Sequence, residues 1–407
     1  MSESPRPTFL RRLNMFDVSL ITMGSIVGSV IFRSPSVVAA RAHAPGMIVA
    51  AWMLGGFIAL CGVWIAAELT ARRPTEGGFY AYLRDAFHPI VAFIFGWLYL
   101  FGIDTGAVAA SGVTFANYFQ PLTGLQVPPA ILAGTTIAFF MVVNFFGVRQ
   151  GGTTQNMLAV AKLSGVALLV GAGVFAHPTA AADRSFVPFG TATSALAAFG
   201  VAMIPVFFAY NGFLSATYVI GETKDPRRTL PRGLLAGICI VIPMYVAVNI
   251  VCVHVLGAPA LGLSKAPASD VMSVALGPIG ARIIAIVVTL STLGFISTKM
   301  LVTPRLYHRM AADGLFFKAV AWVHPKTRVP VFAIAIQGGI DRQLCGVAGL
   351  CFRRPRRRRT RHFPAPRCRN AAGRWRILHD AGPPVYDGRI FLRGHGRRRR
   401  YVRVVSS

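Results

Sequence analysis

The sequence predicts an all-α protein, a polytopic bundle of transmembrane helices that is truncated after about eight helices. Three observations lead to this fold class. Hydrophobic residues make up 54% of the 407 residues and charged residues only 14%, with a mean hydropathy of +0.56, whereas a soluble domain carries about 25% charged residues. Apolar runs of about 20 residues recur over roughly the first 300 residues, which is the length that crosses a hydrocarbon layer. Two of these runs are interrupted near their middle.

The apolar runs predict eight spans and the start of a ninth. Short charged or Pro/Gly-containing segments separate them. Residues 1–12 form a polar cytoplasmic segment that enters the first span without a small-residue cleavage site, so we expect no signal peptide. The spans are expected at residues 15–38, 46–70, 90–118, 128–147, 155–176, 193–220, 233–256 and 280–303, with a ninth beginning at Val329.

Lysine and arginine are distributed unevenly between the connecting segments. With the N-terminus in the cytoplasm, the inner segments carry sixteen cations and the outer segments carry five, which are Arg33, Arg41, Arg184, Lys265 and Arg282. Cationic loops stay on the cytoplasmic side of a membrane. The sequence therefore predicts a multi-pass protein of the cytoplasmic membrane with a cytoplasmic N-terminus and the lipid bilayer as its surroundings.

The first and sixth spans contain segments that weaken a helix. Residues 24–32 read GSIVGSVIF, and Pro205 is followed by FAYNG at residues 208–212. Unwound backbone inside a bilayer is tolerated only where it lines a cavity or meets a ligand. Two broken helices, each the first of a five-helix repeat, indicate a substrate site at the bilayer midplane. The alternative is that the small residues only allow close helix packing.

Four stretches resemble the amino acid-polyamine-organocation superfamily, near its L-type amino acid transporters. They lie in order within residues 13–336: residues 24–35 (GSIVGSVIFRSP), 67–80 (AELTARRPTEGGFY), 218–232 (YVIGETKDPRRTLPR), and TPR at 303–305 with MAADGLFF at 310–317. The resemblance implies twelve helices in an inverted repeat of the leucine-transporter type, and uptake or exchange of L-amino acids by alternating access. Residues 13–176 would form the first five-helix repeat and residues 177–340 a partial second repeat, with helices six to eight and the start of nine.

The same resemblance assigns the substrate positions to the two broken helices. Backbone N–H groups of the first helix would hold the substrate carboxylate, as a helix N-terminus does, and freed carbonyls of both helices would accept the substrate ammonium. Phe208 would also close over the substrate as an outer gate, although it could simply face lipid or the core. The expected set is Gly28, Ser29, Val30 and Ile31 for the carboxylate, Ile26, Phe207, Phe208 and Ala209 for the ammonium, and Asn211 beside them.

Three positions depart from the family pattern. Family members usually have glycine at Val30, commonly glycine at Asn211 and often tryptophan at Phe213. A β-branched side chain at Val30 crowds the backbone that should approach the carboxylate. The size of the substrate is therefore open.

Ionisable residues inside spans are costly and carry a functional hypothesis. Lys162 matches a lysine that, in many family members, occupies the place of a sodium ion in sodium-coupled relatives, and its alternative is snorkelling to the interface. Asp104 lies near the middle of the third span, too deep for an easy pair with Lys162, so it is either a protonatable coupling group or a neutral hydrogen-bonded acid. Lys299 is expected to snorkel.

The arginine-rich tail, residues 341–407, does not fit the membrane pattern. It holds 19 arginines and no lysine, with a net charge of +16 out of +28 for the chain. CGN arginine codons read one base later and followed by C become GNC, which encodes Ala, Gly, Val or Asp, so a frameshift close to Gly339 is one hypothesis. The other is a genuine, disordered basic tail that binds anionic lipid or nucleic acid.

No enzyme constellation accompanies these features. The histidines are scattered, no GxSxG or Walker pattern occurs, and the six cysteines have no paired spacing. We expect no enzyme activity, no cofactor, no metal and no nucleic-acid partner. The expected ligand is an amino acid, bound as a small-molecule substrate. A membrane sensor that binds without transporting is the alternative function, and the sequence gives neither the oligomeric state nor the particular amino acid.

Overall fold

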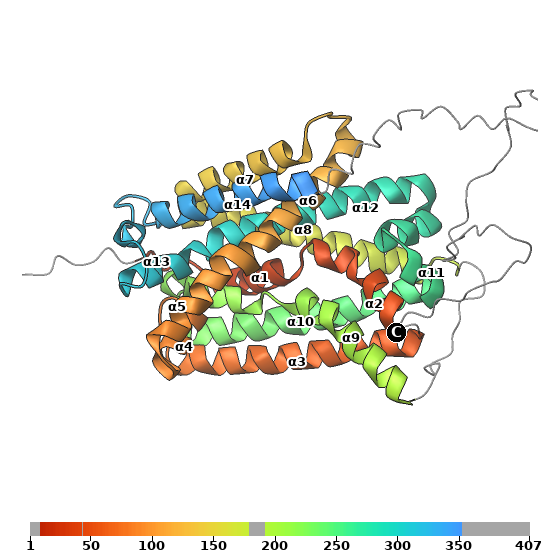
Figure 1. Ribbon diagram of the computed structural model, residues 1–407, viewed down its shortest axis with the longest axis horizontal. Coiled ribbons are helices and arrows are strands. Elements are labelled where there is room, and N and C mark those ends of the chain that lie inside the picture. Colours follow the sequence, from red (N-terminus) through yellow and green to blue (C-terminus); the bar gives the residue numbers. More distant parts are fainter. Residues whose placement is uncertain (1–8, 43, 179–191, 352–407) are drawn as a thin grey trace, which may run out of the picture. The chain divides into compact units, whose positions relative to one another are not determined.

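The computed structural model describes residues 9–351 with the exception of residues 43 and 179–191 (Figure 1). Every regular element in that part of the chain is a helix, apart from an isolated bridge between Leu13 and Thr223. The prediction of an all-α bundle is therefore confirmed. Of the arginine-rich tail, residues 352–407 lie outside the described residues.

The first span is broken into three pieces, as the sequence predicts. Helix α1 (Met15–Ile26) begins at Asn14, whose side chain accepts the backbone N–H of Asp17 while the Asp17 carboxylate accepts the N–H of Asn14, a reciprocal capping arrangement. A 3₁₀ turn, η1 (Ser29–Phe32), follows the break, and α2 (Ser34–Ala42) completes the span.

The rest of the first repeat consists of four spans. They are α3 (Pro45–Arg72), the composite of α5 (Pro89–Leu98), η2 (Tyr99–Ile103) and α6 (Asp104–Thr123), then α7 (Pro129–Phe145) and α8 (Val148–Val174). The short α4 (Phe79–Ala86) joins the second span to the third. η2 is a π-helical turn, a feature that shifts helix register and is frequent at functional sites.

The second repeat opens with another broken span. Helix α9 (Ala192–Tyr210) gives way at Gly212 to the 3₁₀ segment η3 (Phe213–Glu222). The remaining elements are α10 (Pro226–Leu256), α11 (Ala258–Leu263), α12 (Pro267–Val302), α13 (Pro304–Ala312), η4 (Lys318–Ala321) and α14 (Val331–Cys351). A positive φ of 63° at Gly277 separates the first turns of α12 from its long apolar part.

Matching helices of the two repeats pack against each other. Helix α3 packs on α10, α6 on α12, and α7 on α14 (Figure 1). Helix α1 lies between α8 and α10, so the broken first span is surrounded by continuous helices. These long helices hold the two breaks in place.

Six helical segments of the described chain are long and apolar enough to cross a membrane, and α1 and α7 are shorter apolar helices. The outward sides of these helices are also apolar. On α3, for example, Phe57 and Trp64 are 61% and 63% exposed while Trp52 on the same helix is fully buried. Such a surface fits lipid contact rather than water.

Helix α14 differs from the sequence prediction. The sequence predicts that the partial second repeat ends at residue 340 and that residues from 341 onward are foreign to the membrane plan. The helix instead continues to Cys351, with Gln337 and Asp341 fully buried against the bundle. Asp341 stays in the helix because it points at a polar cluster on α6, described below.

Candidate substrate-binding site

The two breaks meet at one point. At the first break, Val27 and Gly28 have extended backbone between α1 and η1. At the second, Gly212 has a φ of 125°, and a Cβ built on it would lie 2.3 Å from the Ser25 carbonyl oxygen. Only glycine allows both this conformation and this approach. The sequence therefore places the two unwound segments in direct contact.

Lys162 of α8 holds the first break open. Its ammonium donates hydrogen bonds of 2.8 Å to the carbonyl oxygens of Gly24 and Val27, and the residue has no exposed surface. The snorkelling interpretation is wrong because the amine ends inside the bundle. The Lys162 amine thus replaces the helical hydrogen bonds that the two carbonyls have lost.

A central cavity of about 430 Å³ lies beside the breaks. Four parts of the chain enclose this central cavity: the α1–η1 break, the α9–η3 break, η2 with α6, and α12. Six of the nine expected substrate residues line it: Ile26, Gly28, Ser29, Val30, Phe208 and Asn211. Its volume falls in the range of small-molecule sites.

The other three expected residues do not line the central cavity. Ile31 and Ala209 are buried in the hydrophobic core, whereas Phe207 is 47% exposed. Its carbonyl oxygen accepts the backbone N–H of Asn211 at 3.1 Å. One full turn of helix thus continues past Phe207, so its carbonyl oxygen is already bonded within the helix.

The carbonyl of Ile26, expected to be free for the substrate ammonium, already has a partner. The Tyr245 hydroxyl of α10 donates to it at 3.1 Å. The hydroxyl of Ser25, unlike the Ile26 carbonyl, has no hydrogen-bond partner within the described chain. Ser25 lines the cavity and is fully buried. A buried hydroxyl without a partner is costly, so Ser25 is a ready contact for a polar ligand.

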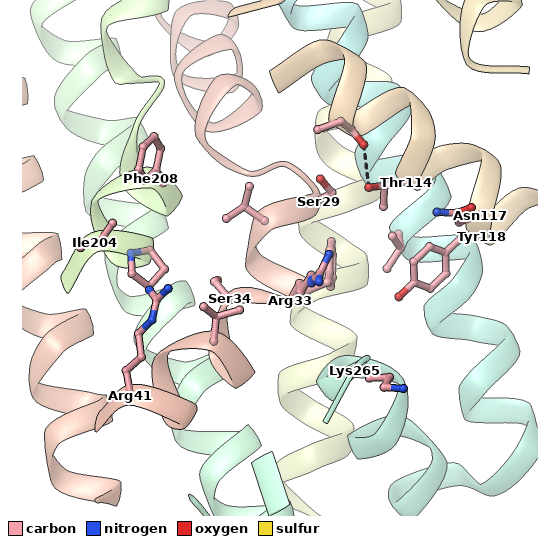
Figure 2. Close-up of a pocket in the computed structure, with 16 residues that line it drawn as sticks. Ser29, Arg33, Ser34, Arg41, Thr114, Asn117, Tyr118, Ile204, Phe208 and Lys265 are labelled. Carbon is pink, nitrogen blue, oxygen red and sulfur yellow. Dashed lines mark hydrogen bonds between the residues drawn. The ribbon is translucent and has the colours of Figure 1, made fainter. Parts of the chain in front are cut away.

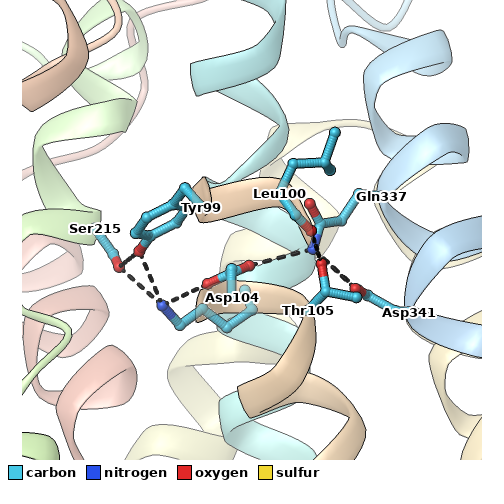
Figure 3. Close-up of polar contacts among 8 residues, drawn as sticks. Tyr99, Leu100, Asp104, Thr105, Ser215, Gln337 and Asp341 are labelled. Atoms are coloured by element: carbon cyan, nitrogen blue, oxygen red, sulfur yellow. Dashed lines mark hydrogen bonds and ion pairs between the residues drawn. The ribbon is translucent and has the colours of Figure 1, made fainter. Parts of the chain in front are cut away.

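An ion pair forms one wall of the central cavity. The Lys299 ammonium of α12 lies 2.8 Å from the Asp104 carboxylate of α6, and both side chains are almost completely buried (Figure 3). The same ammonium donates to the Ser215 hydroxyl at 3.1 Å and to the Tyr99 hydroxyl at 3.4 Å. The expectation that Lys299 snorkels is wrong, because its partner lies deep in the bundle.

The π-helical turn η2 makes this arrangement possible. It offsets α5 from α6 so that Tyr99 and Asp104 both reach Lys299 (Figure 3). The Thr105 hydroxyl donates to the Leu100 carbonyl inside the turn. Such a bond supplies a partner where the regular helical ladder is interrupted.

Helix α14 contributes to the cluster from the other side. The Gln337 amide donates to the Asp104 carboxylate at 3.2 Å and to both Asp341 oxygens at 3.0 and 3.1 Å. Two buried carboxylates therefore share one amide next to a single ammonium. Of these residues the sequence indicated only Asp104. A lone lysine and a lone aspartate, each inside an otherwise apolar span, were the signal that could have paired Asp104 with Lys299.

A second cavity, which we call the outer cavity, adjoins the central one. It measures about 510 Å³ and shares Ser29, Val30, Ala110 and Phe208 with the central cavity. Phe208 lines both cavities and is 69% exposed; Figure 2 shows it at the edge of the outer cavity. The outer gate expected at Phe208 stays a prediction.

The opposite end of the bundle is closed by ion pairs. Arg305 binds Glu222 at 2.9 Å with both side chains buried. Arg84 of α4 binds Asp313, which also accepts from Arg309 at 2.9 Å. These contacts join α4, η3 and α13, and we call them the latch.

Two further contacts reinforce the latch. The backbone N–H groups of Arg12 and Leu13 donate to the Glu222 carbonyl at 2.8 and 2.9 Å, which ties the N-terminal segment to the latch.

Tyr80 lies beside the latch. Burial, together with the Asp313 carboxylate, raises the pKa of its phenol, which therefore stays neutral there.

The chain belongs to the amino acid permease family, whose model matches residues 13–349. It is 29% identical to the serine/threonine exchanger SteT of Bacillus subtilis (strain 168), over 79% of this chain and 73% of that protein. It is 29% identical to the human b(0,+)-type amino acid transporter 1, over 83% and 70%. It is 30% identical to the human large neutral amino acids transporter small subunit 2, over 77% of this chain and 60% of that protein. These relatives are amino acid transporters or exchangers, and the family is one of permeases rather than enzymes.

Solved structures give the same fold. The chain superposes on MhsT in complex with L-phenylalanine with a TM-score of 0.56 and 16% identity, covering 86% of this chain and 81% of that one. It superposes on a Na⁺-coupled sialic acid symporter in a substrate-bound outward-open state with a TM-score of 0.57 and 15% identity, covering 85% and 78%. The predicted superfamily, the inverted-repeat architecture and the expectation of amino acid transport are confirmed.

Proposed function

We propose that this chain binds a free L-amino acid in the central cavity and carries it across the cytoplasmic membrane by alternating access. The observation that carries the proposal is the contact between two broken helices beside a cavity with an unpartnered hydroxyl, Ser25. The first N–H groups of η1 have no acceptor within their own helix. They and Ser25 suit a carboxylate, while the carbonyls near the α9 break suit an ammonium.

The electrostatic balance of the central cavity supports a zwitterionic substrate. Its two charged residues, Lys299 and Asp104, are paired with each other. A cavity with a neutral charge balance does not favour a net anion or a net cation. Val30 is 42% exposed and faces both cavities, which supports a small substrate.

The contacts at one end of the bundle and the cavity at the other support an outward-facing state of the protein. The latch closes the end where the N-terminal segment is held, and the outer cavity opens at the other. The excess of cations at the latch end favours a cytoplasmic N-terminus. Transport then requires the latch to open while Phe208 closes over the substrate.

Uptake of labelled L-amino acids into proteoliposomes tests the proposal. The test variant is Gly212→Ala, which brings a Cβ into the Ser25 carbonyl, and the matched control is Gly171→Ala on α8, where a Cβ meets nothing within 4 Å. We expect uptake by the native chain and the control, and loss of uptake by the test variant. Saturable binding without flux in the native chain would favour a sensor and refute transport.

A further inference from the structure

The outer cavity has a strong charge imbalance. Arg33, Arg41 and Lys265 line it, and no aspartate or glutamate does. The three cations come from different elements: the end of η1, helix α2, and the connection between α11 and α12. They surround the cavity rather than lying on one helix face (Figure 2).

None of the three cations has an ion-pair partner among the described residues. The carboxylate of Asp270, near the start of α12, accepts a hydrogen bond from the Ser264 hydroxyl at 2.5 Å. Lys299 and Arg305, by contrast, each form an ion pair with a buried carboxylate. Clefts lined by charge of one sign focus the field and concentrate ligands of the opposite sign.

A buried hydroxyl in the same wall has no partner. Ser34 lines the outer cavity, is 4% exposed, and its hydroxyl makes no hydrogen bond within the described chain. Thr114, across the cavity, instead donates its hydroxyl to the Ala110 carbonyl at 2.8 Å (Figure 2). The wall thus offers one free donor next to two guanidinium groups, which bind carboxylates with two parallel hydrogen bonds.

The outer and central cavities therefore differ in the charge that they favour. The central cavity contains one cation and one anion in direct contact, and the outer cavity contains three cations and no anion. At about 510 Å³ the outer cavity is large enough for a whole amino acid with water. Phe208 stands between the two.

We propose that the outer cavity is a second ligand site, selective for the carboxylates of anionic amino acids such as dicarboxylic ones. Arg33, Arg41 and Lys265 supply the charge, and Ser34 supplies a neutral donor. None of these four residues lines the central cavity, so this inference holds whether or not the chain carries out net transport.

A charged thiol reagent measures the site without relying on transport. All six native cysteines are replaced by alanine, and Asn117, an exposed residue of the outer cavity, is changed to cysteine. The reaction rate is compared for an anionic and a cationic methanethiosulfonate, with and without L-glutamate, L-alanine, L-lysine or sodium sulfate. The test variant carries Arg33→Gln, Arg41→Gln and Lys265→Gln. The control carries Arg282→Gln, an exposed cation that does not line the cavity.

We expect the anionic reagent to react faster than the cationic one, with a rate ratio that falls about tenfold in the triple variant and is retained in the control. Glutamate should protect the cysteine where alanine and lysine do not, and the triple variant should lose this protection. An unchanged ratio in the triple variant, equal protection by alanine, or equal protection by sulfate would overturn the proposal.

Equilibrium binding to the native chain provides a measurement that needs no cysteine replacement. Labelled L-glutamate should bind in detergent with an affinity that falls at least tenfold as ionic strength rises from about 0.05 to 0.5 M, because added salt screens the three cations. Absence of glutamate binding, or binding that does not depend on salt, would refute the site. Failure of amino acid uptake alone would refute only the proposed function.

Discussion

The buried pair of Asp104 and Lys299 permits a quantitative test of the cavity wall. Removing one partner leaves the other charged in a place with almost no water. Such a loss costs about 3–5 kcal/mol, whereas replacing both charges is often close to neutral. We therefore expect Asp104→Asn and Lys299→Gln to be severely destabilising when made singly, and the double variant to be more stable than either.

The magnitude can be compared with the total stability of a protein. A domain is stable by about 5–15 kcal/mol, so either single variant should lose a large part of it. Lys299 also donates to Ser215 and Tyr99, which keeps a neutral glutamine at that position hydrogen-bonded in the double variant. The expected coupling energy between the two sites is on the order of 3 kcal/mol.

The measurement is thermal unfolding of the purified protein in one detergent, followed by fluorescence, with labelled amino acid uptake in parallel. Glu68→Gln is the matched control, because Glu68 and Arg72 form an ion pair with 53% and 76% exposed side chains, and exposed pairs contribute about 0–1 kcal/mol. Additive single effects, or a stable Asp104→Asn variant, would refute the account of this wall.

Three further predictions concern the breaks and the latch. Lys162→Met should reduce the free energy of unfolding by at least about 2 kcal/mol, because the buried carbonyls of Gly24 and Val27 each lose a hydrogen bond of 2.8 Å; an unchanged unfolding temperature would contradict this. Ser25→Ala should weaken amino acid binding about fivefold without changing stability, since its hydroxyl makes no bond in the unliganded site; equilibrium binding measures it, and unaltered affinity would remove Ser25 from the site. Arg84→Gln should open the latch and increase labelling of a cysteine on α4 from the cytoplasmic side; unaltered labelling would mean that the buried Glu222 pair closes that end alone.

Local features of the chain account for what the sequence could predict. The spans follow from apolar runs, and the two breaks follow from the Gly-Ser segment at residues 24–29 and from Pro205 with Gly212. Six of the nine expected substrate residues lie at the central cavity, because they are adjacent to the breaks. The Phe207 carbonyl, expected to be free for the substrate ammonium, accepts the backbone N–H of Asn211 because the last helical turn of α9 continues past it.

Features that depend on how helices rotate against each other were not predictable. The two lone charges in apolar spans are a signal for pairing Lys299 with Asp104, but the sequence does not give the helix rotations that bring α12 and α6 face to face at these residues. It also does not reveal that Tyr245 reaches the Ile26 carbonyl. The continuation of α14 was missed for a related reason. An aspartate at position 341 reads as the end of an apolar span until Gln337 and the cluster on α6 provide its partners.

The π-helical turn between α5 and α6 fits one extra residue into a turn of the third span. Its i→i+5 bonding brings Tyr99 and Asp104, which are five residues apart, onto the same face of the helix, where both reach Lys299. In a regular α-helix, residues five apart lie about 140° apart around the axis. Winding the same residues into a regular α-helix would therefore turn the Tyr99 hydroxyl away from the ion pair, although no charge would change.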